Sequence, residues 1–159
     1  MGVLDTLSYL LAGDDTAASR DAAAALVRSY IDCARRTAQL ERHAKMAPHT
    51  GGAQALQRLA AEDAEQGLRL RRAVEAAGAS LPSMAAELPQ RDGLNHWARL
   101  VDDLDAHQRC VMQARELALR LAARLPQTAA LFESLYRAEA SHCEKLRALI
   151  ARADPQALD

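Results

Sequence analysis

Apolar side chains recur every three or four residues along four long segments of the chain, the spacing that places them on one face of an α-helix. These segments span approximately residues 19–47, 53–77, 92–125 and 128–153. A residue that disfavours a helix follows each segment; these residues are Pro48, Gly78, Pro126 and Pro155. The pattern predicts four long helices, with short connections after the first and the third.

A shorter apolar segment, residues 3–12, comes before these helices. Gly13, Asp14 and Asp15 follow it, and glycine and aspartate are weak helix formers, so the sequence predicts a break there. We expect three parts: a short N-terminal helix with a linker over residues 1–18, a four-helix bundle over residues 19–153, and a C-terminal tail over residues 154–159.

The connection between the second and third helices, residues 78–93, is much longer than the other two. It holds Pro82, Pro89 and two glycines, and it shows no helical periodicity. A segment of this length can span about 50 Å when extended, whereas the second helix is about 39 Å long. We therefore expect a long crossover that returns along the whole helix and makes the second and third helices parallel.

The amino-acid composition supports a fold made of helices alone. The chain has 36 alanines and 24 leucines, but only 12 valines, isoleucines and threonines in total. Alanine and leucine favour helices, whereas strands are built mainly from β-branched and aromatic residues. The expected fold class is therefore all-α, and an all-β or α/β fold is excluded.

The net charge and the hydropathy of the chain argue against nucleic acid as a partner and against a membrane span. The formal net charge is −1 and aromatic residues are few, so we expect no basic surface or base-stacking platform for nucleic acid. No run of about 18 apolar residues occurs, so no membrane span is expected. Three cysteines without a CxxC pair, the absence of a basic leader and an Ala-, Arg- and Leu-rich composition favour a bacterial cytoplasm.

Polar side chains interrupt the apolar stripe of each predicted helix near its middle. They are Tyr30, Asp63, Gln66, His107, Glu139 and His142. A buried carboxylate without a partner costs several kcal/mol, so these groups are expected to form one shared cluster in which they pair with one another, with water or with a metal. Two interpretations stay open, a hydrogen-bonded network inside an apolar bundle and a metal site.

The second and fourth helices repeat each other at a constant offset of 76 residues. The matched pairs are Leu59 and Leu135, Asp63 and Glu139, Gln66 and His142, and Leu70 and Leu146. The first and third helices match more weakly, at an offset of 77. Two similar helical hairpins indicate a bundle with pseudo-twofold symmetry.

The fourth helix carries Glu139-Ala-Ser-His142, a Glu-x-x-His motif that places both side chains on one helix face. With this motif and the repeat, the chain resembles the ferritin-like superfamily, and its rubrerythrin-like members in particular, from the first helix to the last. The resemblance implies a four-helix bundle with a long crossover and a role in oxidant or iron handling. It also implies two Glu-x-x-His motifs, with one further Glu from each remaining helix, around two iron ions.

The chain departs from that ligand set. Asp63 and Gln66 stand where the second motif would be, and Tyr30 and His107 lie near the positions of the remaining glutamates. Two core carboxylates cannot balance two divalent ions, so we expect at most one ion, iron or zinc. The expected ligands are His107, Glu139 and His142, with Asp63 as the fourth.

Other polar residues are expected outside the core. Those assigned to the surface are His43, His49, His96, Asp32, Asp102, Asp103 and Asp105. Cys143 adjoins His142 but lies about 100° away around the helix, so we interpret it as a packing residue.

Two classes of function stay open. The first is a metal-dependent protein active in oxidant or iron handling, as the resemblance implies. The alternative is a non-enzymatic, metal-free bundle that acts as a scaffold for self-association or a protein partner, or that holds a small ligand in a pocket. No catalytic residue is assigned. The apolar residues of segment 3–12 need to be covered, and we expect a homodimer.

Overall fold

The computed structural model describes residues 3–82 and 92–156, with side chains from residue 16 onward. It contains four α-helices: α1 (Val3–Lys45), α2 (Thr50–Ala76), α3 (His96–Leu121) and α4 (Pro126–Ile150). No strand occurs in these described ranges. The prediction of an all-α four-helix bundle is therefore confirmed.

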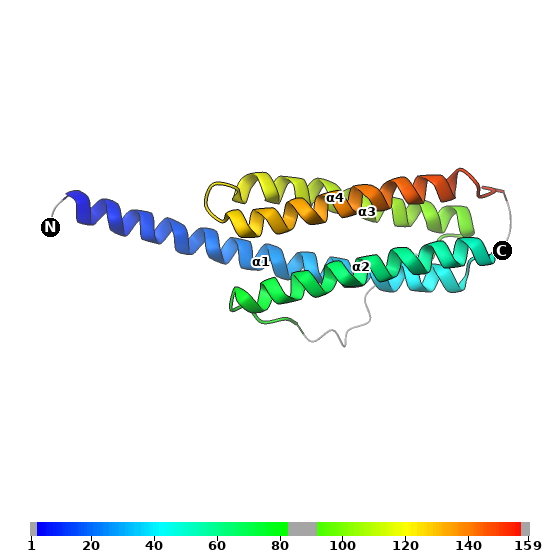
Figure 1. Ribbon diagram of the computed structural model, residues 1–159, viewed down its shortest axis with the longest axis horizontal. Helices are drawn as coiled ribbons and strands as arrows, with labels where there is room; N and C mark the ends of the chain where they lie inside the picture. The colour runs from blue at the N-terminus through cyan, green and yellow to red at the C-terminus, as the bar shows by residue number, and fades with distance from the viewer. Residues whose placement is uncertain (1–2, 83–91, 157–159) are drawn as a thin grey trace.

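The helices form two antiparallel hairpins that pack against each other (Figure 1). α1 packs along α2, α3 packs along α4, and α1 also contacts α3 across the two hairpins. α2 and α3 begin at the same end of the bundle, where Gly52 lies close to the ring of His96. The two helices are therefore parallel, as predicted. The predicted crossover between them includes residues 83–91, which lie outside the described part of the chain.

α1 is a single helix that continues past the end of the bundle (Figure 1). The predicted break, and with it the separate short N-terminal helix, is wrong, because the helix runs through Gly13 and the two aspartates that follow. One glycine inside a helix costs only about 1 kcal/mol relative to alanine. Alanines at positions 17, 18 and 22–25 follow without a proline, so the helix propagates through the weak point.

The N-terminus of α3 lies later than expected. Asn95 caps this helix, because its side-chain oxygen accepts a hydrogen bond from the Ala98 N–H at 2.8 Å. Asp92, the first residue of the segment predicted to be helical, forms an ion pair with Arg42 on α1 instead. The helix consequently starts at His96 rather than near Asp92.

The remaining helix ends differ from the prediction by a few residues. α2 begins at Thr50, so Gly51 and Gly52, which precede the segment predicted to be helical, belong to its first turn. It ends just before Gly78, whose φ of 68° matches the expected glycine stop. α4 begins at Pro126, because proline is favoured in the first helical turn. α3 ends at Leu121 and α4 at Ile150, each earlier than expected.

The interior consists of two apolar clusters with a polar layer between them. One cluster includes Phe132 and Leu135, and the other includes Leu40 and Leu146. All four helices contribute to both clusters. In α4 the polar layer falls between Leu135 and Leu146, where the stripe analysis predicted it.

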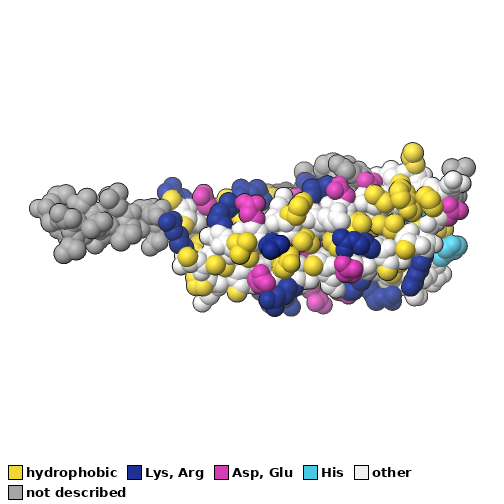
Figure 2. Space-filling model, turned by 90° about the horizontal axis from the view of Figure 1, so that it is seen from above, with side chains coloured by type: hydrophobic (Ala, Val, Ile, Leu, Met, Phe, Trp, Pro, Cys, Tyr) yellow, Lys and Arg dark blue, Asp and Glu magenta, His cyan; other side chains and the backbone are white. Residues whose placement is uncertain are grey.

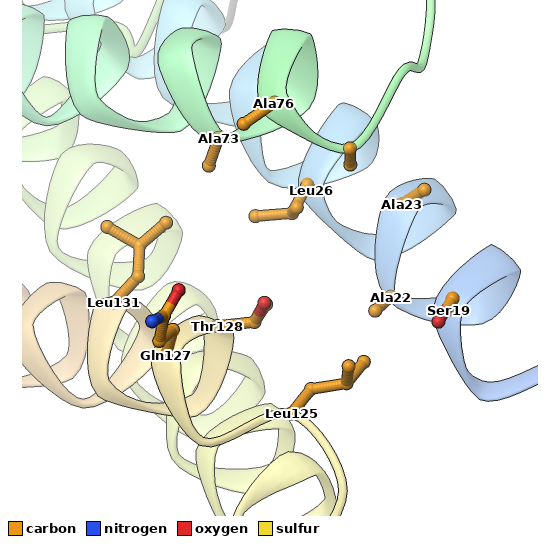
Figure 3. A pocket seen from close by; sticks show the side chains of 11 residues that line it. Ser19, Ala22, Ala23, Leu26, Ala73, Ala76, Leu125, Gln127, Thr128 and Leu131 are labelled. Atoms are coloured by element: carbon orange, nitrogen blue, oxygen red, sulfur yellow. The ribbon is translucent and has the colours of Figure 1, made fainter. Parts of the chain in front are cut away.

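A cleft lies between α1, α2 and α4 at the end of the bundle from which α1 projects (Figure 3). Its volume is about 430 Å³, and its walls include Ala22, Leu26, Ala73, Leu125 and Leu131. The alanines of α1 and α2 are too short to fill the space opposite α4, so the cleft stays open.

The surface carries charges of both signs. On the face shown in Figure 2, Lys and Arg side chains are interspersed with Asp and Glu side chains. Among the described residues, no helix combines the length and the apolar character needed to cross a membrane.

Phe132→Ala is expected to destabilise the bundle strongly, because the ring is fully buried in an apolar cluster. We expect the free energy of unfolding to fall by about 3–5 kcal/mol, measured by urea denaturation followed by circular dichroism. Leu119→Ala is the control, because Leu119 is 72% exposed. Its effect should stay below about 0.5 kcal/mol, and equal losses in the two variants would contradict the assignment of the core.

Candidate metal centre

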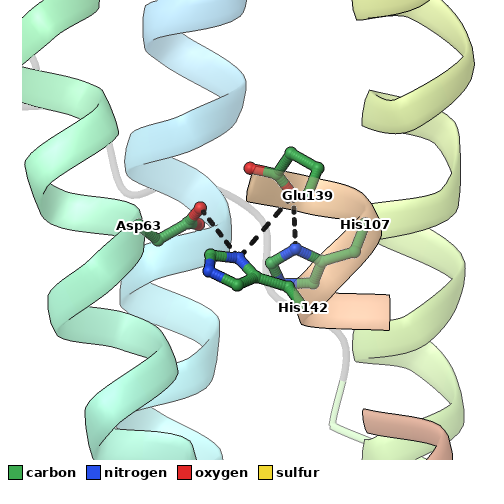
Figure 4. Close-up of side chains that lie close together, drawn as sticks. All are labelled: Asp63, His107, Glu139 and His142. Carbon is green, nitrogen blue, oxygen red and sulfur yellow. Dashed lines mark hydrogen bonds and ion pairs between the residues drawn. The ribbon is translucent and has the colours of Figure 1, made fainter. Parts of the chain in front are cut away.

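Four titratable side chains meet in the polar layer (Figure 4). They are Asp63 on α2, His107 on α3, and Glu139 and His142 on α4. None of them is more than 2% exposed. Each offers one ligand atom, and these atoms lie within 4.8 Å of one another. The structure thus brings together four of the six polar residues on the apolar stripes, and these four are the expected metal ligands.

The helix arrangement explains why these side chains meet. Glu139 and His142 are three residues apart on α4, so both leave the same face of the helix. His107 comes from α3, the hairpin partner of α4, and Asp63 comes from α2 of the other hairpin. The cluster therefore forms only when the two hairpins are docked.

The two other polar residues of the stripes lie outside the cluster. Tyr30 is half-buried and packs against the apolar cluster that contains Phe132. Gln66 is half-buried, one turn along α2 from Asp63. In the described part of the chain, the hydrogen bonds of the clustered side chains are with Arg36, with Glu62 and between His107 and Glu139, and none is with Tyr30 or Gln66.

Each histidine of the cluster has one ring nitrogen engaged and one without a hydrogen-bond partner in the described part of the chain. His107 Nδ1 lies 2.6 Å from Glu139 Oε2, which leaves Nε2 without a partner. His142 Nε2 lies 3.0 Å from Glu62 Oε2, which leaves Nδ1 without one. A carboxylate on one ring nitrogen fixes the orientation and tautomer of a histidine, and metal-binding histidines commonly have such a partner.

Asp63 is the least satisfied group of the cluster. Among the described residues, neither of its carboxylate oxygens has a hydrogen-bond partner. Asp63 Oδ1 lies 3.9 Å from His142 Nδ1, and Glu139 Oε2 lies 4.0 Å from the same nitrogen. An unsatisfied buried polar atom costs about 1–3 kcal/mol. A metal ion bound between these atoms would satisfy several of them at once.

One cation at the cluster was not predicted, Arg36 on α1. Its side chain is almost completely buried; Nη2 lies 3.0 Å from Glu139 Oε1, and Nε lies 3.5 Å from Asp63 Oδ2. The apolar spacing of the sequence is consistent with burial of this arginine. Position 36 is three residues after Cys33 and four before Leu40, so it fits the buried stripe of α1 as well as the next residue does.

Glu62 was also not predicted, and it links the cluster to the surface. Its carboxylate, which is 45% exposed, contacts His142 and lies 2.6 Å from Lys145 Nζ. The ammonium of Lys145 lowers the pKa of Glu62, so Glu62 is ionised when it contacts His142.

Burial and charge push the two core carboxyl pKa values apart. Burial raises the pKa of Asp63 to about 7, although the charge of Arg36 acts in the opposite direction. For Glu139, burial is outweighed by the hydrogen bond with His107 and by the charge of Arg36, which lower the pKa to about 2. Burial lowers the pKa of His142, so its ring is neutral at pH 7, the form that binds metals.

A second buried pair lies between α1 and α3 and corrects the prediction that His43 and Asp103 are surface residues. His43 Nδ1 lies 2.8 Å from Asp103 Oδ2, and Gln39 Nε2 donates to Asp103 Oδ1 at 2.8 Å. Asp103 is one helical turn before His107, and His43 is one turn after Gln39, so both continue the core-facing sides of their helices.

Comparisons with protein-family models and with curated proteins do not identify a relative. No protein-family model matches the chain, and no curated protein matches it significantly. The functional argument therefore depends on the geometry of the polar layer.

Asp63→Asn is expected to change how the stability of the metal-free protein depends on pH. Because the pKa of Asp63 is raised, the folded state keeps a proton that the unfolded state loses above about pH 4, so stability falls as the pH rises from about 4 to 7. The asparagine variant lacks this effect. Its free energy of unfolding should exceed that of the native protein by on the order of 2 kcal/mol at pH 8, and by less at pH 5.

Urea denaturation with a chelator present measures this difference at both pH values. Asp32→Asn is the control, since Asp32 is partly exposed and paired with Arg35 on its own helix. Its effect on stability should be the same at pH 5 and pH 8. A difference between native protein and Asp63→Asn that does not grow with pH would contradict the raised pKa.

Proposed function

We propose that this four-helix bundle binds one divalent metal ion, iron or zinc, through Asp63, His107, Glu139 and His142. The observation that carries the proposal is that each of the four buried side chains offers one ligand atom and that these atoms lie within 4.8 Å of one another. In addition, His142 Nδ1 and both carboxylate oxygens of Asp63 have no hydrogen-bond partner among the described residues. Imidazole nitrogens together with carboxylate oxygens are a common donor set for Zn²⁺ and for non-haem Fe²⁺.

The charges of the polar layer favour one ion over two. Asp63 and Glu139 supply two negative charges, and Arg36 neutralises one of them. One divalent ion leaves a single excess positive charge, whereas a second ion would leave three between two apolar clusters. The cost of such a buried charge argues for a centre with a single ion.

The surrounding residues support a preorganised ligand set. Glu62 holds one nitrogen of His142, and Arg36 holds one oxygen of Glu139, so both ligand side chains keep a fixed orientation. A bound ion would supply Lewis-acid chemistry or, for iron, one-electron chemistry. Together with the resemblance to the ferritin-like superfamily, this arrangement supports a role in oxidant or iron handling.

A second candidate function is self-association, and the projection of α1 beyond the bundle favours it (Figure 1). A helix of about 15 residues without a partner is only marginally stable in water. Positions 3, 4, 7, 10 and 11 of this segment are apolar and follow a helical spacing. We propose that a second copy of the chain covers the projecting part of α1.

The cleft at the base of the projection fits this assembly (Figure 3). If two α1 helices pair antiparallel about a twofold axis near residue 13, residue 4 of one copy lies opposite residue 22 of the other. Ala22 lines the cleft together with Leu26 and Leu125. The cleft of each copy would thus lie opposite the N-terminal end of the partner's α1.

Protein purified without a histidine tag and loaded with Zn²⁺ or Fe²⁺ should hold about one ion per chain, measured by elemental mass spectrometry. His142→Leu removes a ligand and should abolish this binding. It should also abolish the increase in Tm that an ion bound only to the folded state gives the native protein.

His43→Gln is the matched control for that experiment. His43 is as buried as His142 and also contacts a carboxylate, but it lies outside the cluster. This variant should keep about one ion per chain. A loaded native protein that holds no ion and shows no change in Tm would mean that the cluster is a hydrogen-bonded network.

Light scattering should give a mass of about 34 kDa for the native protein, twice the 17.2 kDa of one chain. The double variant Leu7→Glu with Leu10→Glu should be a monomer, because it places charges on the apolar stripe of the projecting helix. Leu119→Glu, at an exposed position of α3, should remain a dimer. A native species of about 17 kDa at micromolar concentration would rule out self-association.

A further inference from the structure

Arg36 and the two histidines contact different oxygens of the same two carboxylates. The guanidinium of Arg36 lies 3.0 Å from Glu139 Oε1 and 3.5 Å from Asp63 Oδ2. The other oxygen of Glu139, Oε2, lies 2.6 Å from His107 Nδ1 and 4.0 Å from His142 Nδ1. The other oxygen of Asp63, Oδ1, lies 3.9 Å from His142 Nδ1. Glu139 is thus shared between Arg36 and both imidazoles, and Asp63 between Arg36 and His142.

We propose that Arg36 fills a second cation position at this centre, and that its charge limits the centre to one metal ion. The proposal rests on the proposed function for the first ion. A carboxylate that directs one oxygen toward Arg36 and the other toward an imidazole is able to bridge two cations. A guanidinium keeps its charge at every pH at which the protein is folded, so it is a permanent occupant of the second position.

A small polar cavity lies beside Arg36, between α1 and α3, and would give a second ion the space it needs. Its volume is about 110 Å³, and its lining includes Arg36, Asp32, Arg109 and Cys110. A cavity of this size is large enough for water molecules. With a shorter side chain at position 36, the cavity would extend to the carboxylates of Asp63 and Glu139. Water molecules would then be able to complete the ligand set of a second ion.

R36E is the direct test, because it removes the guanidinium and adds a carboxylate at the same place. We expect this variant to bind two ions per chain where the native protein binds one, measured by native mass spectrometry with Zn²⁺ and with Mn²⁺. R36Q removes the charge without adding a strong ligand. It should bind the first ion at least about tenfold more tightly than the native protein, because the repulsion between the ion and Arg36 is gone.

R35E and R36K are the control variants. Arg35 is 40% exposed, lines the same cavity and pairs with Asp32, so R35E makes the same change of charge one residue away from the cluster. R36K keeps the positive charge at the cluster. Both should bind one ion with an affinity close to that of the native protein.

Folding of R36E is monitored by circular dichroism with and without Zn²⁺, since a third buried carboxylate destabilises the metal-free state. Folding that depends on the ion would itself demonstrate binding and support the proposal. If R36E remains unfolded with the ion present, the affinity of R36Q decides the question. An R36Q affinity equal to that of the native protein would then overturn the proposal.

The pattern of binding separates this proposal from the proposed function. One ion in the native protein and two in R36E supports both. No ion in the native protein but one or two in R36E refutes the proposed function and keeps Arg36 as the cation that excludes metal. If the native protein and R36E each bind one ion and R36Q binds it with the native affinity, only the inference about Arg36 is overturned. If no variant binds an ion, both the proposed function and the inference about Arg36 are overturned.

Discussion

The contacts of the Arg36 guanidinium with the carboxyl groups of Glu139 and Asp63 are the interaction on which the centre of this bundle depends. Two acidic side chains enclosed by apolar clusters would strongly destabilise the fold if they ionised without a cation between them. Removing one partner of such a buried pair commonly costs about 3–5 kcal/mol. Arg36 thus allows the bundle to keep a polar layer, and it ties α1 to α2 and α4 at a place where α1 supplies no metal ligand.

A comparison within the molecule shows what distinguishes the candidate centre from a structural network. His43 and Asp103 form a second buried histidine–carboxylate pair, and there both oxygens of Asp103 have a hydrogen-bond partner. In the candidate centre, by contrast, both oxygens of Asp63 lack one among the described residues. Asp103 therefore has its hydrogen bonds satisfied, whereas Asp63 has only the longer contacts with Arg36 and His142 in the described part of the chain. This contrast favours a ligand at Asp63 over a general tolerance of unpaired polar groups.

Helical periodicity predicted much of the fold and all four clustered residues. Asp63, His107, Glu139 and His142 could be placed because each lies on an apolar stripe, and a polar side chain on such a stripe has to meet a partner. The parallel course of α2 and α3 followed from the length of the connection between them. These inferences needed only spacing and chain length, which a single sequence contains.

The residues that sequence reasoning missed are those whose type suggests the surface. Arginine is buried rarely, so Arg36 was passed over although position 36 fits the stripe. Asp103 and His43 were also expected at the surface because of their residue types. Their burial depends on their contact with each other and on the hydrogen bond from Gln39 to Asp103. The start of α3 could not be predicted either, because it involves a contact between distant parts of the chain. Asp92 pairs with Arg42 of α1, and Asn95 caps the helix.

The pKa values of the cluster connect the structural role of Arg36 with metal binding. In the metal-free protein below about pH 7, Glu139 balances the charge of Arg36, while Asp63 is protonated. His142 is neutral at pH 7, because burial lowers its pKa. The layer then carries no net charge from Arg36 and the two acids, which explains how it persists between two apolar clusters. An ion that binds Asp63 has to displace its proton. The raised pKa that stabilises the metal-free bundle therefore also keeps Asp63 ready to exchange a proton for a metal ion near neutral pH.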